Sequence, residues 1–295
     1  MHYGYLVGLF DILGFEKKLA SIGLTEMLAR YEVLIEAVNY QKDHEQRVFN
    51  DMGFVESPYW TSDGDVFIFS KIHGAYASDS ILLWANRTWP EARDTPPEDI
   101  ETLSKDPATS WKFHPIPCDN FLDICNDLMC CGLEVGLPLR GAISMGEAVL
   151  DGNKNIFLGH PIIEAARLER GQKFIGAGLC KSFVNQTIPK RFSLQFDKHL
   201  KDGYSEQCGG LVLDWPRHWR KTRSEDVSQI IGAMNNDTQH AAYYEHTLDL
   251  IAHSDKFASQ FDSREEKSIR SVYDEFSFAN KKLIVPARAI RRVPI

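Results

Sequence analysis

Three acidic side chains lie where strand-like segments end or turn, and their placement suggests cation chemistry. Asp11 ends the apolar run YGYLVGLFD, while Asp63 and Asp65 lie in the turn between the apolar stretches 54–60 and 66–70. Carboxylates on strands of one sheet can converge, and hard divalent cations bind one or two carboxylates together with substrate phosphates. This is the pattern that a Mg²⁺–nucleotide site would need. For each residue taken alone, the alternative is an Asp that only accepts N–H bonds in its turn.

The segments that would position these acids predict a mixed α/β order. Residues 3–11 fit a strand buried on both faces, residues 25–38 carry apolar residues at helical spacing, and Asp63-Gly64 is a strong hairpin-turn signal. Further along, the pattern predicts a helix over 119–133, strands over 139–149 and 155–159, a helix over 161–170, strands over 191–196 and 210–214, and helices over 225–252 and 264–281.

The composition is that of an ordinary globular protein, with 295 residues of which 43% are hydrophobic and 25% are charged. The net charge of -8 argues against a nucleic-acid partner. No stretch approaches the roughly 20 apolar residues of a membrane span, and the start carries no secretion signal, so we expect a cytoplasmic protein with no membrane partner. The six cysteines form no C-x-x-C pair and are expected to be reduced thiols.

The domain organisation is predicted from patterning and proline content. We expect a catalytic core over residues 1–200 and a C-terminal strand and helical extension over 201–295. A proline-rich stretch at about 85–117 is read as a surface insertion into the core. The basic and aromatic run 217–223 is typical of a solvated helix start.

Residues 10–15 (FDILGF) resemble the F-D-I-x-G-F segment of the class III nucleotidyl cyclases. In that family the Asp binds both metal ions, the Ile carbonyl assists, and the loop amides hold the triphosphate. The resemblance therefore implies that Asp11 and Ile12 are metal ligands. It also implies that the substrate is bound by Phe10, Ile12, Leu13, Gly14 and Phe15. Gly14 would let the loop approach closely, and successive N–H groups at a strand-to-helix turn form an anion cradle.

Gly64-Asp65 is similar to the family's hairpin Gly-Asp, so Asp65 is implied as the second metal ligand. Asp63 is the alternative, because a two-residue slip keeps the side chain on the same strand face.

Two further segments resemble family motifs. Residues 139–146 (LRGAISMG) are similar to R-x-G-I-x-x-G, and residues 159–169 (GHPIIEAARLE) to G-x-x-V-N-x-A-A-R-L-E. Arg167 falls on the transition-state arginine, whose guanidinium would stabilise charge on the reacting phosphate. The family's asparagine is replaced by Ile163.

The positions that read the purine edge in purine cyclases are Thr61 and Ile156 here, and neither matches an adenine or guanine reader. Tyr59 and Trp60 would shorten the base pocket, which favours a smaller base. Over residues 3–180 the chain is similar to the pyrimidine cyclases of bacterial anti-phage signalling.

This resemblance implies a ferredoxin-like palm core and a head-to-tail homodimer in which Asp11 and Asp65 come from one subunit and Arg167 from the other. It implies two Mn²⁺ or Mg²⁺ ions per site, UTP as substrate with CTP as the alternative, and a cyclic pyrimidine monophosphate that activates a separate effector protein. Two other hypotheses stay open. One is a purine or cyclic-dinucleotide cyclase, because Gly64-Asp65-Val66-Phe67 superficially resembles G-G-D-E-F; the other is an inactive nucleotide-binding or scaffold protein, because of Ile163.

Overall fold

The computed structural model describes residues 3–51, 59–60, 66–69, 72–86, 111–114, 118–152, 154–184, 192–204, 208–235 and 240–257. The chain divides into two compact units, Met1–Ser254 and Asp255–Ile295. Thr61, Asp63, Asp65 and the helix predicted over 264–281 lie outside the described residues.

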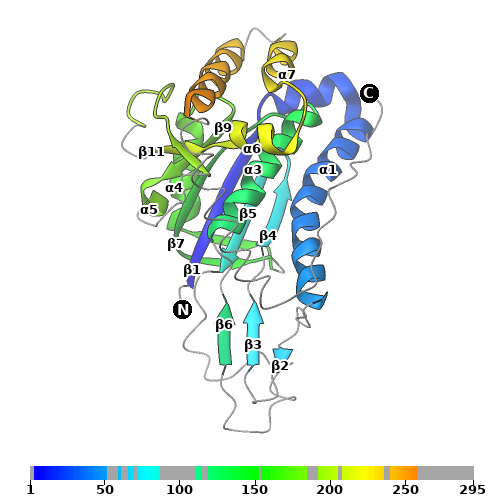
Figure 1. Ribbon diagram of the computed structural model, residues 1–295, viewed down its shortest axis with the longest axis vertical. Helices are drawn as coiled ribbons and strands as arrows, with labels where there is room; N and C mark the ends of the chain where they lie inside the picture. The colour runs from blue at the N-terminus through cyan, green and yellow to red at the C-terminus, as the bar shows by residue number, and fades with distance from the viewer. Residues whose placement is uncertain are drawn as a thin grey trace. The chain divides into compact units, whose positions relative to one another are not determined.

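The first unit is built on an eight-stranded mixed sheet with the order β10-β11-β9-β7-β1-β5-β4, in which β8 also pairs with β7 (Figure 1). β1 is antiparallel to both of its neighbours, β5 and β7, whereas β7 and β9 are parallel. The strands are β1 (Tyr3–Ile12), β4 (Ile72–Ala77), β5 (Ser80–Asn86), β7 (Leu139–Asp151), β8 (Ile156–Gly159), β9 (Gly176–Cys180), β10 (Ser193–Gln195) and β11 (Cys208–Leu213). The predicted mixed α/β class is confirmed.

Helices cover both faces of this sheet. They are α1 (Phe15–Asp51), α3 (Cys118–Glu134), α4 (His160–Gly171), α5 (Lys181–Val184), α6 (Trp215–Thr222) and α7 (Val227–Met234). Residues 241–254 of this unit form a further helix, which we call the C-terminal helix. α1 and α3 pack together in the main core, whereas α4 packs on β7, β1 and β9 through a separate cluster that includes Ala165 and Leu168.

The central position of β1 follows from its apolar sequence. Leu6 and Phe10 join the main core with α3, and Val7 joins the cluster on the opposite face. Residues two apart share a face, so Asp11 is on the Val7 face, toward α4. Across the strand pair, Gly141 leaves room for the ring of Phe10, because a Cβ atom at position 141 would overlap that ring. The predicted doubly buried strand is thus confirmed.

A three-stranded sheet is formed by β2 (Tyr59–Trp60), β3 (Val66–Phe69) and β6 (Trp111–His114). The predicted hairpin is present as β2 and β3, and β6 pairs in parallel with β3 from within the stretch read as an insertion. This hairpin does not share a sheet with β1, so the condition under which Asp65 would converge with Asp11 in one sheet is not met. The hairpin that pairs with β1 is β4–β5, in residues for which the sequence pattern predicted no element.

Other differences concern the last third of the unit. The helix predicted over 225–252 is divided into α7, which ends at Met234, and the C-terminal helix. β9 was not predicted, since its two glycines dilute the strand pattern, although all five of its residues are buried. In the part of the chain that the structure describes, no helix has both the length and the apolarity to cross a membrane.

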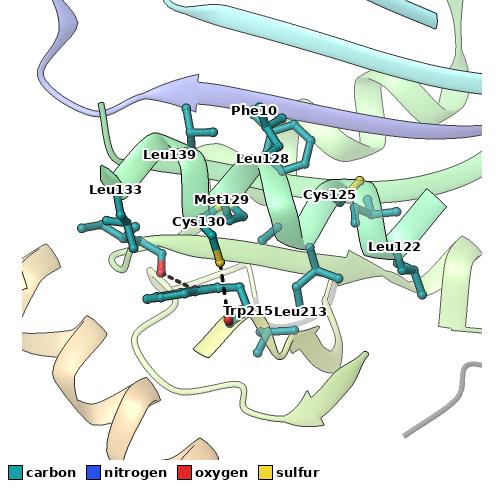
Figure 2. Close-up of a cluster of buried hydrophobic side chains, with 14 of the residues drawn as sticks. Phe10, Leu122, Cys125, Leu128, Met129, Cys130, Leu133, Leu139, Leu213 and Trp215 are labelled. Atoms are coloured by element: carbon teal, nitrogen blue, oxygen red, sulfur yellow. Dashed lines mark hydrogen bonds between the residues drawn. The ribbon is translucent and has the colours of Figure 1, made fainter. Parts of the chain in front are cut away.

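α3 and α6 meet in a dense core (Figure 2). Trp215 is fully buried there, and its indole N–H donates to the carbonyl of Ile175 at 3.2 Å. The Cys130 thiol donates to the carbonyl of Trp215 at 3.8 Å. Burial raises the pKa of the Cys130 thiol. The run 217–223 is therefore not simply solvated, because Arg217 and Trp219 within it are also buried.

The C-terminal helix is fixed to the start of β9 by one buried hydroxyl. Thr247 Oγ1 accepts a hydrogen bond from the Ile175 amide at 2.9 Å and donates to the carbonyl of Tyr243 at 2.6 Å. Apolar burial of Tyr244, Leu250 and Ile251 adds to this attachment. The helix therefore holds its first turn, including Tyr243, in a defined place.

We predict that Thr247→Val lowers the free energy of unfolding by about 1–3 kcal/mol, because the buried Ile175 amide loses its acceptor while side-chain volume is kept. Urea unfolding measures the change. Thr25→Val is the matched control, since Thr25 is exposed on α1. Equal effects of the two substitutions would contradict the anchoring role of Thr247.

Candidate functional site

The end of β1 and the β4–β5 turn bring two carboxyl groups together. The turn consists of Ser78 and Asp79, and Ser78 has a φ of +57°, which is uncommon for a residue with a side chain. The Ile12 amide donates to the Asp79 carbonyl at 2.9 Å, which fixes the turn against β1. The carboxyl group of Asp79 lies close enough to that of Asp11 to raise the pKa of Asp11.

Arg140 supplies the positive charge of this cluster. The β1–β7 register places it opposite Asp11, and its Nη2 is 3.3 Å from Asp11 Oδ2. The same Nη2 forms a close ion pair with Glu169 of α4. The side chains of Arg140 and Glu169 are only 15% and 8% exposed, so the pair is shielded from water. Nη1 of Arg140 donates to the hydroxyl of Tyr243 at 3.1 Å.

Burial raises the pKa of Asp11 to about 6. Arg140 acts against this rise, and the negative charges of Glu169 and Asp79 add to it. Asp11 thus lies among one guanidinium and two further acidic groups. The site has an excess of acidic oxygen that a cation can satisfy.

The donor set fits a hard divalent cation bound together with a substrate. Asp11 and Asp79 offer carboxylate oxygens, and a cation bound between them would offset their negative charges. Within the described ranges, no group of three or more His, Cys, Asp and Glu side chains is arranged to hold a metal. Two carboxylates completed by phosphate oxygens are the usual mode for Mg²⁺. Ile12, predicted to add its carbonyl, is next to Asp11 with its side chain in the core.

The loop 10–15 is only partly available to an anion. The side chains of Phe10, Ile12 and Leu13 are buried, and the amides of Ile12 and Leu13 donate to Asp79 and Pro138 carbonyls. Gly14 has a φ of +71°, and α1 starts at Phe15. An anion cradle would therefore use the amides from Gly14 onward, at the start of α1.

Arg167 and Ile156 lie away from Asp11 of the same chain. Arg167 is exposed on α4, two residues and about 200° round the helix from the buried Glu169. Ile156 pairs with Asp151, at the far end of β7 from Arg140. Tyr59 lies in β2, outside the eight-stranded sheet. Among the predicted site residues that the structure describes, those of the Asp11 loop lie together, and Arg167, Ile156 and Tyr59 lie elsewhere.

Asp79, Glu169 and Tyr243 had no role predicted from the sequence. The first had a readable signal, since Ser78-Asp79-Ser80 precedes the apolar run Ile81–Ala85, the same pattern of an acidic turn before a strand that singled out Asp65. Tyr243 had no such signal, because only the docking of the C-terminal helix brings it to Arg140.

We predict that the wild-type protein, in a chelator, loses stability relative to Asp11→Asn as the pH rises from 4 to 7. A carboxyl whose pKa is raised on folding binds more protons in the folded state, so its ionisation through this window destabilises the fold. Thermal unfolding at several pH values measures the difference, and adding Mn²⁺ at pH 8 should stabilise only the wild-type protein.

The control for this series is Asp202→Asn, an exposed loop residue that should follow the wild-type pH profile. Parallel pH profiles for Asp11→Asn and the wild-type protein would contradict the raised pKa.

Comparison with known proteins does not identify a family for the chain. No protein-family model matches the chain, and a search of the curated proteins finds no matching relative.

Proposed function

We propose that this protein is a pyrimidine nucleotide cyclase that converts UTP, or alternatively CTP, to the 3′,5′-cyclic monophosphate and pyrophosphate. Asp11 and Asp79 are the proposed ligands of two Mn²⁺ or Mg²⁺ ions. Asp79 takes the role that the family motif implied for Asp65, because the turn that carries Asp79 precedes β5, and β5 pairs with β1. The product would activate a separate effector protein, as in the anti-phage systems that the sequence resembles.

The observation that carries this proposal is the position of the Asp79 turn beside Asp11: Asp11 pairs with Ser80, and the Ile12 amide donates to the Asp79 carbonyl at 2.9 Å. It arises from the succession β1, α1, β4, β5, α3, β7 with the strand order β7-β1-β5-β4. That succession is the β-α-β-β-α-β order of ferredoxin-like folds, which supports the palm core that the motifs imply. An acid at the end of the first strand and an acid in the hairpin beside it suit a site for a nucleoside triphosphate with its cations.

The chain's own groups divide the work of the proposed reaction. Asp11 and Asp79 hold the cations, which when bound polarise the phosphates and lower the pKa of the attacking 3′ hydroxyl. The amides from Gly14 onward and the start of α1 orient the polyphosphate. Arg167 stabilises the negative charge that develops as the 3′ oxygen attacks the α-phosphorus and pyrophosphate leaves in line.

The position of Arg167 supports a site built across two chains. It is exposed on the same face of α4 as Ile163, four residues earlier, which is 49% exposed. Leu158, 64% exposed on β8, and Val149 on β7 extend the exposed apolar residues of this region. Such residues suit burial against a second copy, whose Asp11 would then receive Arg167.

We predict that the purified protein with Mn²⁺ forms a cyclic pyrimidine monophosphate when ATP, GTP, CTP and UTP are supplied separately. Mass spectrometry of the products identifies the base. Asp79→Ala should abolish the product, because the cation loses a ligand. A purine product would support the purine-cyclase alternative instead.

The assignment of the second ligand is tested by Asp65→Ala and Asp79→Ala side by side. Loss of activity only in Asp65→Ala would overturn Asp79 as the ligand. Asp202→Asn serves again as the exposed-acid control.

A second prediction concerns the two-chain site. Asp11→Ala and Arg167→Ala, each inactive alone, should regain about a quarter of wild-type activity when unfolded together and refolded, because half of the dimers then hold one intact site. Mixing Asp11→Ala with Asp79→Ala is the control and should regain none, since both residues belong to one chain's half-site. No recovery in the first mixture would contradict the shared site.

One observation favours the alternative of an inactive nucleotide-binding protein. Arg140 lies against Asp11, where a cation would bind, and Ile163 replaces the family's asparagine. In that case nucleotide and Mn²⁺ would bind, yet no pyrophosphate would form. The product assay above separates the two functions.

A further inference from the structure

Arg140 and a cation compete for the same carboxylate. If a divalent ion is bound by Asp11, that ion and the positively charged guanidinium of Arg140 repel one another at close range. Arg140 must therefore be held by other groups if Asp11 is to serve as a cation ligand. The inference below rests on the cation site of the proposed function.

The distances show which groups hold Arg140. Its Nη2 is 3.3 Å from Asp11 Oδ2, longer than the roughly 2.7–2.9 Å of a strong charge-assisted hydrogen bond, whereas its contact with Glu169 is close. The guanidinium is thus displaced toward Glu169. On its other side, Nη1 bonds to the hydroxyl of Tyr243 at 3.1 Å.

Tyr243 is well placed to maintain this displacement. The guanidinium carbon lies 5.6 Å from the centre of its ring, within the range of a cation–π contact. The Tyr243 carbonyl is held by Thr247, which is itself bonded to the start of β9. The ring of His240 packs edge-on against the ring of Tyr243, with 5.9 Å between the ring centres. Tyr243 is therefore a fixed anchor.

We propose that Tyr243 is a positioning residue that, with Glu169, holds the guanidinium of Arg140 away from Asp11 and so leaves the Asp11 carboxylate able to bind a divalent cation. This gives the C-terminal helix a role in the site. It also makes the affinity for the cation depend on a residue more than 200 positions from the first ligand in sequence.

The test is Mn²⁺ binding without nucleotide, measured by calorimetry and by the electron paramagnetic resonance of free Mn²⁺. Tyr243→Phe keeps the ring and removes the hydroxyl acceptor, so Arg140 can move onto Asp11, and the Kd for Mn²⁺ should rise about threefold. Arg140→Gln removes the competing cation and should lower the Kd by about tenfold. In the Arg140→Gln background, Tyr243→Phe should have no further effect.

Two controls keep the result specific. Glu245→Gln changes an exposed charge on the same helix and should leave Mn²⁺ affinity unchanged. Thermal unfolding of Tyr243→Phe should stay close to that of the wild-type protein, since the ring packing is retained. Arg140→Lys, which keeps the positive charge but loses the forked donors, is used should Arg140→Gln fail to fold. In its background the effect of Tyr243→Phe should shrink.

Unchanged Mn²⁺ affinity in Tyr243→Phe would overturn the inference. So would an effect of Tyr243→Phe on the Kd for Mn²⁺ that is equal in the presence and absence of Arg140. The absence of Mn²⁺ binding by both the wild-type protein and Arg140→Gln would overturn it as well. Cyclic nucleotide formation together with any of these results leaves the proposed function intact. Conversely, coupling between Tyr243 and Arg140 in a protein that forms no cyclic product would support the inference and reject the proposed function.

Discussion

The antiparallel register of β1 between β5 and β7 is the constraint on which the candidate site depends. It places Asp11 opposite Ser80 on one side and Arg140 on the other. A shift by one residue on either side would send one of these partners to the other face of the sheet. The register is fixed by burial, because Phe10 and Val7 on β1 belong to different cores on the two faces. Packing of the sheet therefore decides which charges meet.

The cluster that results contains three acidic groups and one guanidinium. Asp11, Asp79 and Glu169 come from a strand end, a hairpin turn and a helix, and Arg140 forms ion pairs with Asp11 and Glu169. Burial raises the pKa of Asp11, and the negative charges of Glu169 and Asp79 add to the rise. A bound cation would offset these negative charges. The proposed role in cation and phosphate binding rests on this charge distribution.

Glu169 and Arg167 give α4 two roles on opposite faces. Glu169 turns inward to the chain's own Arg140, while Arg167 is exposed. If the proposed two-chain site forms, one short helix would support the acidic half of one site and donate the basic group of the next. The C-terminal helix, which carries no readable motif, would contribute through Tyr243. Its attachment by Thr247 shows how a single buried hydroxyl can fix a contact between distant parts of the sequence.

The sequence alone determined the elements whose patterns are local. The apolar run 3–11, the apolar face of 119–133 and the proline at the start of 161–170 predicted β1, α3 and α4, because burial and helix starts leave periodic or positional signals. It also marked Asp11 through its loop motif. The tertiary structure decided which hairpin lies beside β1: two acidic turns had similar local patterns, and strand pairing is a long-range choice that neither turn encodes. The meeting of Arg140, Glu169 and Tyr243 was likewise decided only by packing, since each residue alone is typical of a strand or a helix.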